Sequence, residues 1–141
     1  MHCVFSTKGR QPWITPELKP RFYAYVAGIA KQNGMRLLCI NGTQNHMHLL
    51  ISLPSSMSLA KSLQLLKGVS SKWIHETFPE QKHFAWQEGY GAFSVSISGI
   101  SETIRYIENQ EEHHRRVSFE EEFVAFLKKH QIEYDERYVW G

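Results

Sequence analysis

The sequence has few cysteines and no long apolar stretch, and each shortage excludes a class of protein. Among 141 residues there are two cysteines, Cys3 and Cys39, both inside apolar runs. We therefore expect reduced thiols rather than a disulfide framework or a cysteine metal site. Apolar runs such as 47–53 are far shorter than the roughly 18 residues that a membrane span requires. The chain does not open with a basic segment followed by an apolar one, so we expect a cytoplasmic protein that is neither secreted nor membrane-bound.

The net charge is also small. The formal value is +2, from 16 lysines and arginines against 14 acidic residues. This balance does not by itself indicate a nucleic-acid-binding protein, which often has a strongly basic domain, so the grouping of the basic residues matters more than their number. With 42% hydrophobic and 21% charged residues, the composition is typical of a globular protein, and we treat residues 1–141 as a single domain.

Alternating and helical spacings of apolar residues predict four strands and four helices. In chain order we expect a strand over 2–7, a helix over 16–32, strands over 35–40 and 45–53, a long helix closed by Pro79, a strand over 92–97, a helix to about residue 112 and a helix over 119–130. The first strand has almost no lead-in, which suggests a clipped or misassigned start. Asn41-Gly42 is the strongest turn signal between the second and third strands, and Thr43 and Gln44 make the expected turn slightly longer than two residues. Ser118 and Glu121 predict a capping box on the last helix.

The order strand, helix, strand, strand, helix, strand, followed by two further helices, is that of the split βαβ, ferredoxin-like arrangement. We therefore predict an α+β fold. Its four-stranded antiparallel sheet would carry helices on one face and be extended by C-terminal helices. Folds of this kind serve many functions, so the function depends on the side chains that the fold carries.

Two histidines alternate with a methionine in the third predicted strand. Side chains two apart on a strand point to the same face, so His46 and His48 can converge on one metal ion while Met47 faces away. A histidine pair on a strand is also compatible with a purely structural role. The pair alone leaves both interpretations open.

Tyr106 and Gln110 lie four positions apart in the third predicted helix, which places them one above the other on the same face. If that face packs over the histidines, Gln110 can add a carbonyl oxygen to two imidazole nitrogens. This donor set suits Mg²⁺ or Mn²⁺ better than a closed zinc site. The Tyr106 hydroxyl would then lie close to the same ion. An aromatic residue at helical spacing also fits a core position, so both interpretations remain open.

Taken together, these motifs resemble those of the single-tyrosine HUH transposases of the smallest bacterial insertion sequences. The resemblance runs over nearly the whole chain, through the segments 4–10, 45–50, 66–68, 86–96, 106–110 and 113–116 and the helix that starts at Ser118-Phe119. It implies that His46, His48 and Gln110 are metal ligands. It also implies that Tyr106 is a nucleophile that cuts single-stranded DNA near hairpins, leaving a 5′-phosphotyrosine and a free 3′-OH.

The resemblance further implies an obligate homodimer in which Tyr106 can serve the histidines of the partner. The candidate DNA-binding residues are Lys8, Arg10, Lys61, Lys67, Lys72 and Arg105. Of these, Lys61 and Lys72 belong to a polar stripe along the second long helix that suits either solvent or phosphate. Trp86 and Tyr90 fit either stacking on unpaired bases or core packing.

Two other functions remain compatible with the sequence. A host-domesticated relative that processes repeated hairpins would carry the same motif residues. A non-catalytic, ferredoxin-like nucleic-acid-binding module would have no reason to hold all four of them together. We expect His113 and His114 at the surface and assign no function to His2.

Overall fold

The fold comes from a computed structural model that describes residues 1–135, 137 and 139–140. Four strands form one antiparallel sheet in the order β2-β3-β1-β4. The strands are β1 (His2–Ser6), β2 (Arg36–Gly42), β3 (His46–Ser52) and β4 (Gly91–Phe93). The helices are α1 (Leu18–Gln32), α2 (Leu59–Thr77), α3 (Ile100–Glu108), α4 (Gln110–His113) and α5 (Phe119–Lys129).

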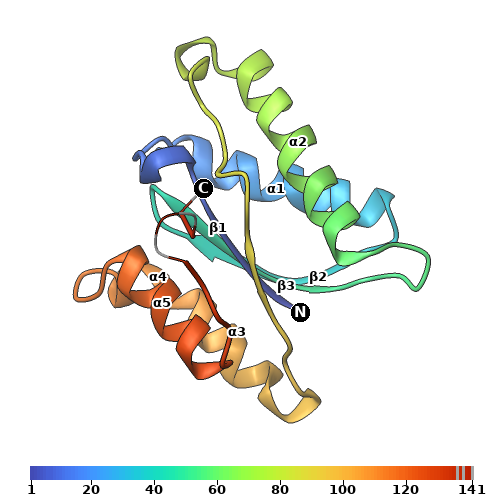
Figure 1. The fold of residues 1–141 in the computed structure, drawn as a ribbon. Coiled ribbons are helices and arrows are strands. Elements are labelled where there is room, and N and C mark those ends of the chain that lie inside the picture. The colour runs from blue at the N-terminus through green and yellow to red at the C-terminus, as the bar shows by residue number, and fades with distance from the viewer. Residues whose placement is uncertain (136, 138, 141) are drawn as a thin grey trace.

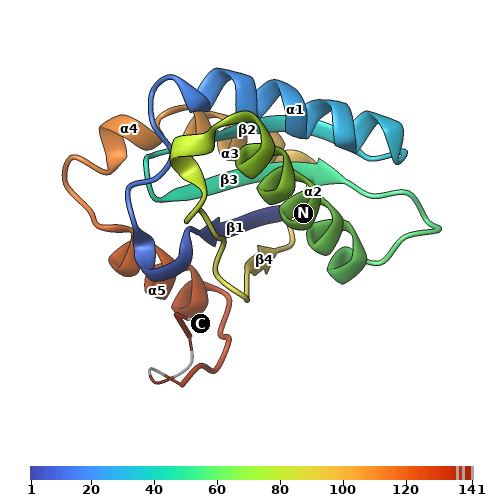
Figure 2. The same ribbon diagram turned by 90° about the horizontal axis from the view of Figure 1, so that it is seen from above.

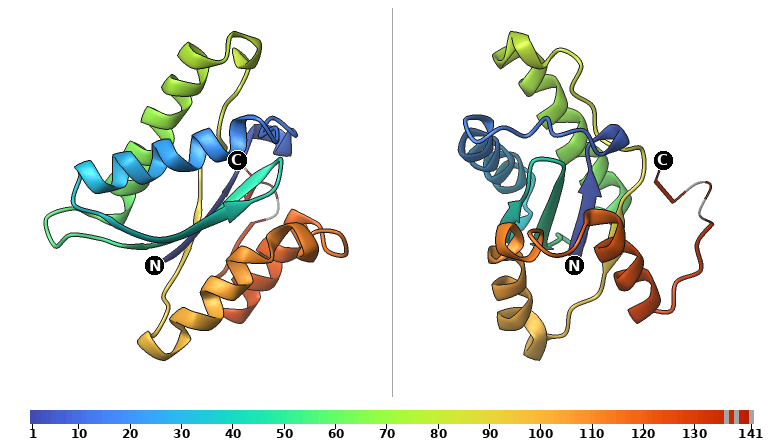
Figure 3. Two further views of the ribbon diagram at one scale, coloured as in Figure 1. Left: turned by 180° about the vertical axis from the view of Figure 1, so that it is seen from behind. Right: turned by 90° about the vertical axis from the view of Figure 1, so that its left-hand side faces the viewer.

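The sheet lies between two layers of helices. Figure 1 shows α1 and α2 on one face and α3, α4 and α5 on the other, and the side view in Figure 3 shows the same arrangement. The strand order can be followed from above in Figure 2. The predicted α+β fold with a four-stranded antiparallel sheet is therefore confirmed, and the C-terminal helices cover the face opposite α1 and α2.

Side-chain alternation in β3 separates a hydrophobic core from a polar site. Met47 packs into the larger apolar core with residues of α1 and α2, including Phe22 and Leu63. His46 and His48 point to the other face, because neighbouring strand residues face opposite sides, and they meet side chains of α4 and α5 there. That face also carries a smaller apolar cluster of Val4, Phe93, Phe119, Phe123 and Leu127.

The predicted turn begins too early, because β2 continues through Asn41 and Gly42 and the chain turns at residues 43–45, which include the predicted Thr43 and Gln44. A Cβ on Gly42 would lie 2.1 Å from the carbonyl oxygen of His46, so the close approach of the two strands requires glycine. The Asn41 side-chain amide donates to the carbonyl oxygens of Ile107 and Glu108 at 2.9 and 3.1 Å. Asn41 therefore binds the end of α3, and Gly42 allows close strand pairing; neither forms a tight turn.

The third predicted helix is interrupted. It divides at Asn109, whose ψ of 19° leaves the helical range, into α3 and the short α4. Asn41 occupies the carbonyl groups that would otherwise accept hydrogen bonds from the next helical turn, which favours this break. Gln110 therefore begins α4 instead of continuing the helix of Tyr106.

Two further expectations concern the C-terminal half, and the end of the chain adds a contact of its own. β4 is shorter than predicted, and Ile97, expected in that strand, is 91% exposed. The capping box of Ser118 and Glu121 is present at the start of α5. Val139 and Trp140 pack against the smaller apolar cluster, whereas Tyr138 lies outside the described residues. Within the described chain, no helix is both long and apolar enough to cross a membrane.

Candidate metal and tyrosine site

The two strand histidines are fully buried beneath the C-terminal helices. Nδ1 of His46 lies 2.8 Å from Asn45 Oδ1 and 2.9 Å from Thr43 Oγ1. Nδ1 of His48 lies 2.8 Å from Nε2 of His2. These contacts orient both rings through their Nδ1 atoms, as the outer contacts of metal-binding histidines commonly do. The Nε2 atom of each ring therefore faces the layer of helices.

The helical residues predicted to join the histidines lie beside them in the same chain. Gln110 is fully buried, and its Oε1 lies 3.0 Å from Nε2 of His46. The ring of half-buried Tyr106 has its centroid 5.8 Å from that of His48. Its hydroxyl donates a hydrogen bond to Oε2 of Glu122. The structure thus brings all four predicted site residues together.

Glu122 was not predicted as a site residue, yet it lies at the centre of the group. It is 3% exposed, and its Oε1 lies 2.8 Å from Nε2 of His48 and 3.6 Å from Nε2 of His46. The sequence did contain an indication of this role. Glu122 is an acidic residue on the otherwise apolar face of α5, between Phe119 and Phe126.

The expected surface position is wrong for His114, because its side chain is only 9% exposed. Its Nε2 lies 3.2 Å from Oε2 of Glu122. His113 is nearer to the expected surface position, because 30% of its side chain is exposed. Its Nε2 also lies 3.2 Å from Glu122 Oε2. His2, to which no function was assigned, is buried behind His48. The fold therefore gathers more histidines around Glu122 than the strand motif contains.

Four side chains form a group that could hold a metal ion. The members of this His/Glu cluster are His46, His48, His114 and Glu122, and their ligand atoms all lie within 4.8 Å of one another. Imidazole nitrogens and a carboxylate oxygen are suitable donors for a divalent first-row metal or Mg²⁺. The amide oxygen of Gln110 borders the cluster at His46.

Burial controls the protonation of the site. It lowers the pKa of His46 and of His2 to about 3, with a further contribution from the charge of His48. Both rings are therefore neutral at pH 7, the form that a metal ligand requires. Burial, followed by the negative charge of Glu122, raises the pKa of Tyr106 well above its ordinary value. The phenol thus needs activation before it can act as a nucleophile.

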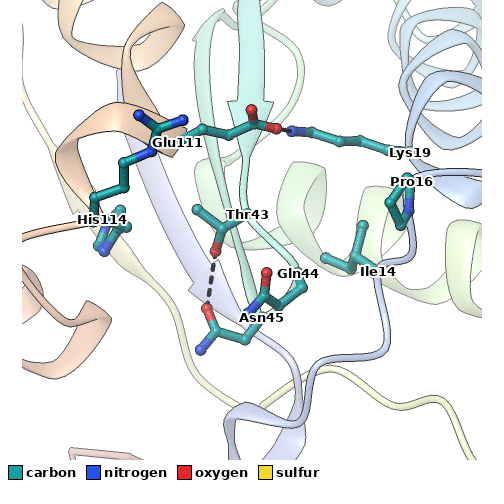
Figure 4. A pocket seen from close by; sticks show the side chains of 9 residues that line it. Ile14, Pro16, Lys19, Thr43, Gln44, Asn45, Glu111 and His114 are labelled. Carbon is teal, nitrogen blue, oxygen red and sulfur yellow. Dashed lines mark hydrogen bonds and ion pairs between the residues drawn. The ribbon is translucent and has the colours of Figure 1, made fainter.

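Two open cavities flank the site. The larger, of about 560 Å³, is lined by Ile14, Pro16, Lys19, Thr43, Gln44, Asn45, Glu111, His114 and Arg115. Figure 4 shows an ion pair between Lys19 and Glu111 along its wall and a hydrogen bond from Thr43 to Asn45 below. The other, of about 420 Å³, includes Tyr106 and Lys129. Polar side chains of both cavities thus lie close to the His/Glu cluster.

Most predicted DNA-binding residues are available at the surface. Lys8, Lys61, Lys72 and Arg105 are exposed and Arg10 is half-buried. Lys67 differs, because its ammonium group donates to the carbonyl oxygens of Gln87, Glu88 and Gly89 and ties α2 to that segment. This placement favours a structural role for Lys67 over phosphate binding.

The two aromatic candidates for base stacking differ in exposure. Trp86 is 8% exposed and packs edge-on against Phe5 and Phe84, which places it in the core. Tyr90 is 37% exposed. Of the two, only Tyr90 therefore has a ring accessible to an unpaired base.

The fold and the site define a protein with an HUH-type histidine cluster on an antiparallel sheet. The family model described as "Transposase IS200 like" matches residues 1–110. The chain therefore belongs to the IS200-like transposases, a family of DNA-processing enzymes. The matched region ends at Gln110, so His114 and Glu122 lie beyond it.

Individual relatives agree with this assignment. The chain is 26% identical over 114 residues to the ISDra2 transposase TnpA of Deinococcus radiodurans, covering 77% of this chain and 81% of the relative. It is 27% identical over 81 residues to the transposase for insertion sequence element IS200 of Salmonella typhimurium, covering 57% of this chain and 53% of the relative.

Solved structures share the fold. A crystal structure from D. radiodurans R1, described as that of a transposase, has a TM-score of 0.63 at 27% identity and covers 77% of this chain and 88% of its own. A REP-associated tyrosine transposase bound to a REP hairpin has a TM-score of 0.62 at 13% identity, with 82% and 68% coverage. At that identity the second likeness concerns the fold alone.

Proposed function

We propose that this protein is a metal-dependent transposase that nicks and rejoins single-stranded DNA at hairpin-marked ends through a 5′-phosphotyrosine intermediate. The observation that carries the proposal is the position of Tyr106, whose ring lies beside His48 and whose hydroxyl contacts Glu122. A tyrosine that only packs in the core would not need a buried carboxylate such as that of Glu122 beside its hydroxyl. Its neighbours fit a nucleophile better than a packing residue.

In this function His46, His48 and Gln110 would hold Mg²⁺ or Mn²⁺. The bound ion would polarise the scissile phosphate and stabilise the charge that develops on it. Tyr106 supplies the attacking oxygen, which loses its proton as it bonds to phosphorus. The bond from phosphorus to the 3′ oxygen breaks, and that oxygen leaves as a 3′-OH. One phosphoester replaces another, so the reverse reaction can join a new 3′ end without ATP.

Several features support DNA as the partner. Exposed Lys61 and Lys72 lie along one face of α2, where they can contact phosphates. The cavity that reaches His114 also carries Lys19 and Arg115. The structural neighbour with a bound REP hairpin has the same fold, and we extend hairpin binding to this chain as part of the proposal. We also propose a homodimer acting in the cytoplasm, as the family resemblance implies.

A host-domesticated relative would use the same chemistry on repeated hairpins, so it differs in genomic setting rather than in the site. A non-catalytic binding module is less compatible with the structure. Such a module gains nothing from a buried carboxylate and three histidines beside a tyrosine, because these groups are expensive to desolvate and contribute no phosphate-binding charge.

The proposal is tested with labelled single-stranded hairpin DNA from the flanks of the gene, incubated with Mn²⁺ or Mg²⁺. We expect a protein–DNA adduct that survives denaturation, that EDTA prevents, and that Tyr106→Phe lacks. Tyr25→Phe is the matched control, since Tyr25 of α1 stacks on Trp73 of α2 through its ring, on the opposite face of the sheet from the cluster. An adduct of equal yield in Tyr106→Phe would overturn the assignment of the nucleophile.

A further inference from the structure

Glu122 is an acidic residue in an apolar position. It occupies the face of α5 that packs on the sheet, with Phe119 and Phe123 beside it in the smaller apolar cluster. It is 3% exposed. A carboxylate at such a depth is strongly destabilising unless other groups compensate its charge.

The compensating groups are unusual for a buried carboxylate. Within the described chain its ion-pair contacts are all with histidines, namely His46, His48, His113 and His114. Lysine and arginine, which carry a permanent charge, are not among these contacts. Its remaining polar neighbours are Tyr106 and Gln110, which are neutral. A divalent cation would supply the missing positive charge while its histidine ligands stay neutral.

The separations also fit a shared ion. Ligands of six-coordinate Mg²⁺ lie about 2.1 Å from the ion, so neighbouring ligand atoms are about 3 Å apart and opposite ones about 4.2 Å apart. Glu122 Oε1 lies 2.8 Å from His48 Nε2 and 3.6 Å from His46 Nε2, and the ligand atoms of the whole cluster lie within 4.8 Å. A small contraction would therefore bring them onto one centre.

We propose that Glu122 is a carboxylate ligand of the divalent ion, and that the ion thereby couples the docking of α5 to the active site. This inference rests on the proposed function and adds to the His46, His48 and Gln110 ligand set a residue beyond the family match at 1–110. One carboxylate then links ion and nucleophile, because its second oxygen accepts the hydrogen bond from Tyr106.

Metal affinity tests this assignment without DNA. Mn²⁺ binding is measured by titration calorimetry for the wild type, Glu122→Gln and Glu121→Gln. Glu121 is an exposed neighbour on α5, and glutamine can keep its place in the capping box. We expect Glu122→Gln to bind Mn²⁺ at least about tenfold more weakly, and Glu121→Gln to match the wild type. Unchanged affinity in Glu122→Gln, or no Mn²⁺ binding by the wild type, would overturn the inference.

The wild-type protein provides a second measurement if Glu122→Gln does not fold. Protein labelled with ¹³C-carboxyl glutamate is loaded with Mn²⁺, and pulsed electron paramagnetic resonance is used to detect coupling between the ion and a ¹³C nucleus. We expect a coupled carboxylate carbon, and its absence would contradict ligation by any glutamate. Amide hydrogen exchange across Phe119–Lys129 should also slow when Mn²⁺ replaces EDTA. Equal exchange would contradict the coupling of α5 to the ion.

These readouts separate the ligand from the reaction. Mn²⁺ binding that depends on Glu122, without any tyrosine adduct on the hairpin, would reject the proposed function and leave the ligand in place. A metal-dependent adduct together with unchanged Mn²⁺ affinity in Glu122→Gln would reject the ligand and leave the function in place.

Discussion

The amide oxygen of Gln110 lies 3.0 Å from Nε2 of His46, although 64 positions separate the two residues in the chain. The contact exists because α3 ends at Glu108 and, after Asn109, a new helical turn presents Gln110 to the sheet. The same amide also donates toward Glu122 at 3.3 Å. Gln110 is thus held between the strand and α5.

Replacing Gln110 tests whether this contact serves metal binding. We expect Gln110→Ala to weaken Mn²⁺ binding by about tenfold, because an oxygen donor and its hydrogen bonds are removed. Calorimetric titration with Mn²⁺ measures the change. The exposed Gln64→Ala on α2 is the control. Affinity equal to that of the wild type would remove Gln110 from the ligand set.

Stability in the absence of metal should depend on pH. His2 and His46 have a pKa of about 3 in the folded chain, against an ordinary value of 6.5. Between these values the unfolded chain binds protons that the folded chain does not, so the free energy of unfolding should fall as the pH falls from 6.5 toward 3. Urea unfolding in EDTA measures this dependence. His46→Asn should show a shallower slope, and a flat profile in the wild type would contradict burial of neutral histidines.

The position of Tyr106 beside His48 of its own chain predicts an active site assembled within one subunit. A mixture of Tyr106→Phe and His48→Ala should therefore form no more adduct than either variant alone. The adduct assay on the mixed proteins gives the answer. Restored adduct in the mixture would show that each tyrosine serves the histidines of a partner.

The exposed lysines of α2 and the tied Lys67 should respond differently to replacement. Removing Lys61 and Lys72 should weaken hairpin binding and reduce its salt dependence, by about 0.7 in the log–log slope for each phosphate that is no longer neutralised. Lys67→Ala should instead lower the free energy of unfolding, because three carbonyl oxygens are left without their donor. Lys31→Ala, on the exposed surface of α1, is the control for DNA binding. If the salt dependence of binding is unchanged after removal of Lys61 and Lys72, this face of α2 contacts solvent and not phosphates.

Local patterns were sufficient to predict much of the fold and the strand histidines. Alternation in β3 predicted that His46 and His48 share a face, since this geometry depends on strand periodicity alone. The capping box at Ser118 was predictable for the same reason, because its partners lie three positions apart.

Contacts between distant segments were not predictable in this way. The roles of Asn41 and Gly42 arise from the end of α3 and the carbonyl of His46, so their strong local turn signal was misleading. Glu122 belongs to the cluster because α5 packs on the strand of His48, and His114 because the end of α4 lies against Glu122. Spacing in the sequence does not reveal that packing. Only Glu122 could have been noticed, because it is a glutamate on an apolar helix face.

The most direct test of the central claim is to identify the residue that carries DNA. The denatured adduct is digested with protease and nuclease, and peptides are sequenced by mass spectrometry. We expect a nucleotide attached through its 5′ phosphate to the peptide that contains Tyr106, formed only when Mn²⁺ or Mg²⁺ is present. A nucleotide on another residue, or an adduct of equal yield in EDTA, would contradict a metal-dependent reaction through Tyr106.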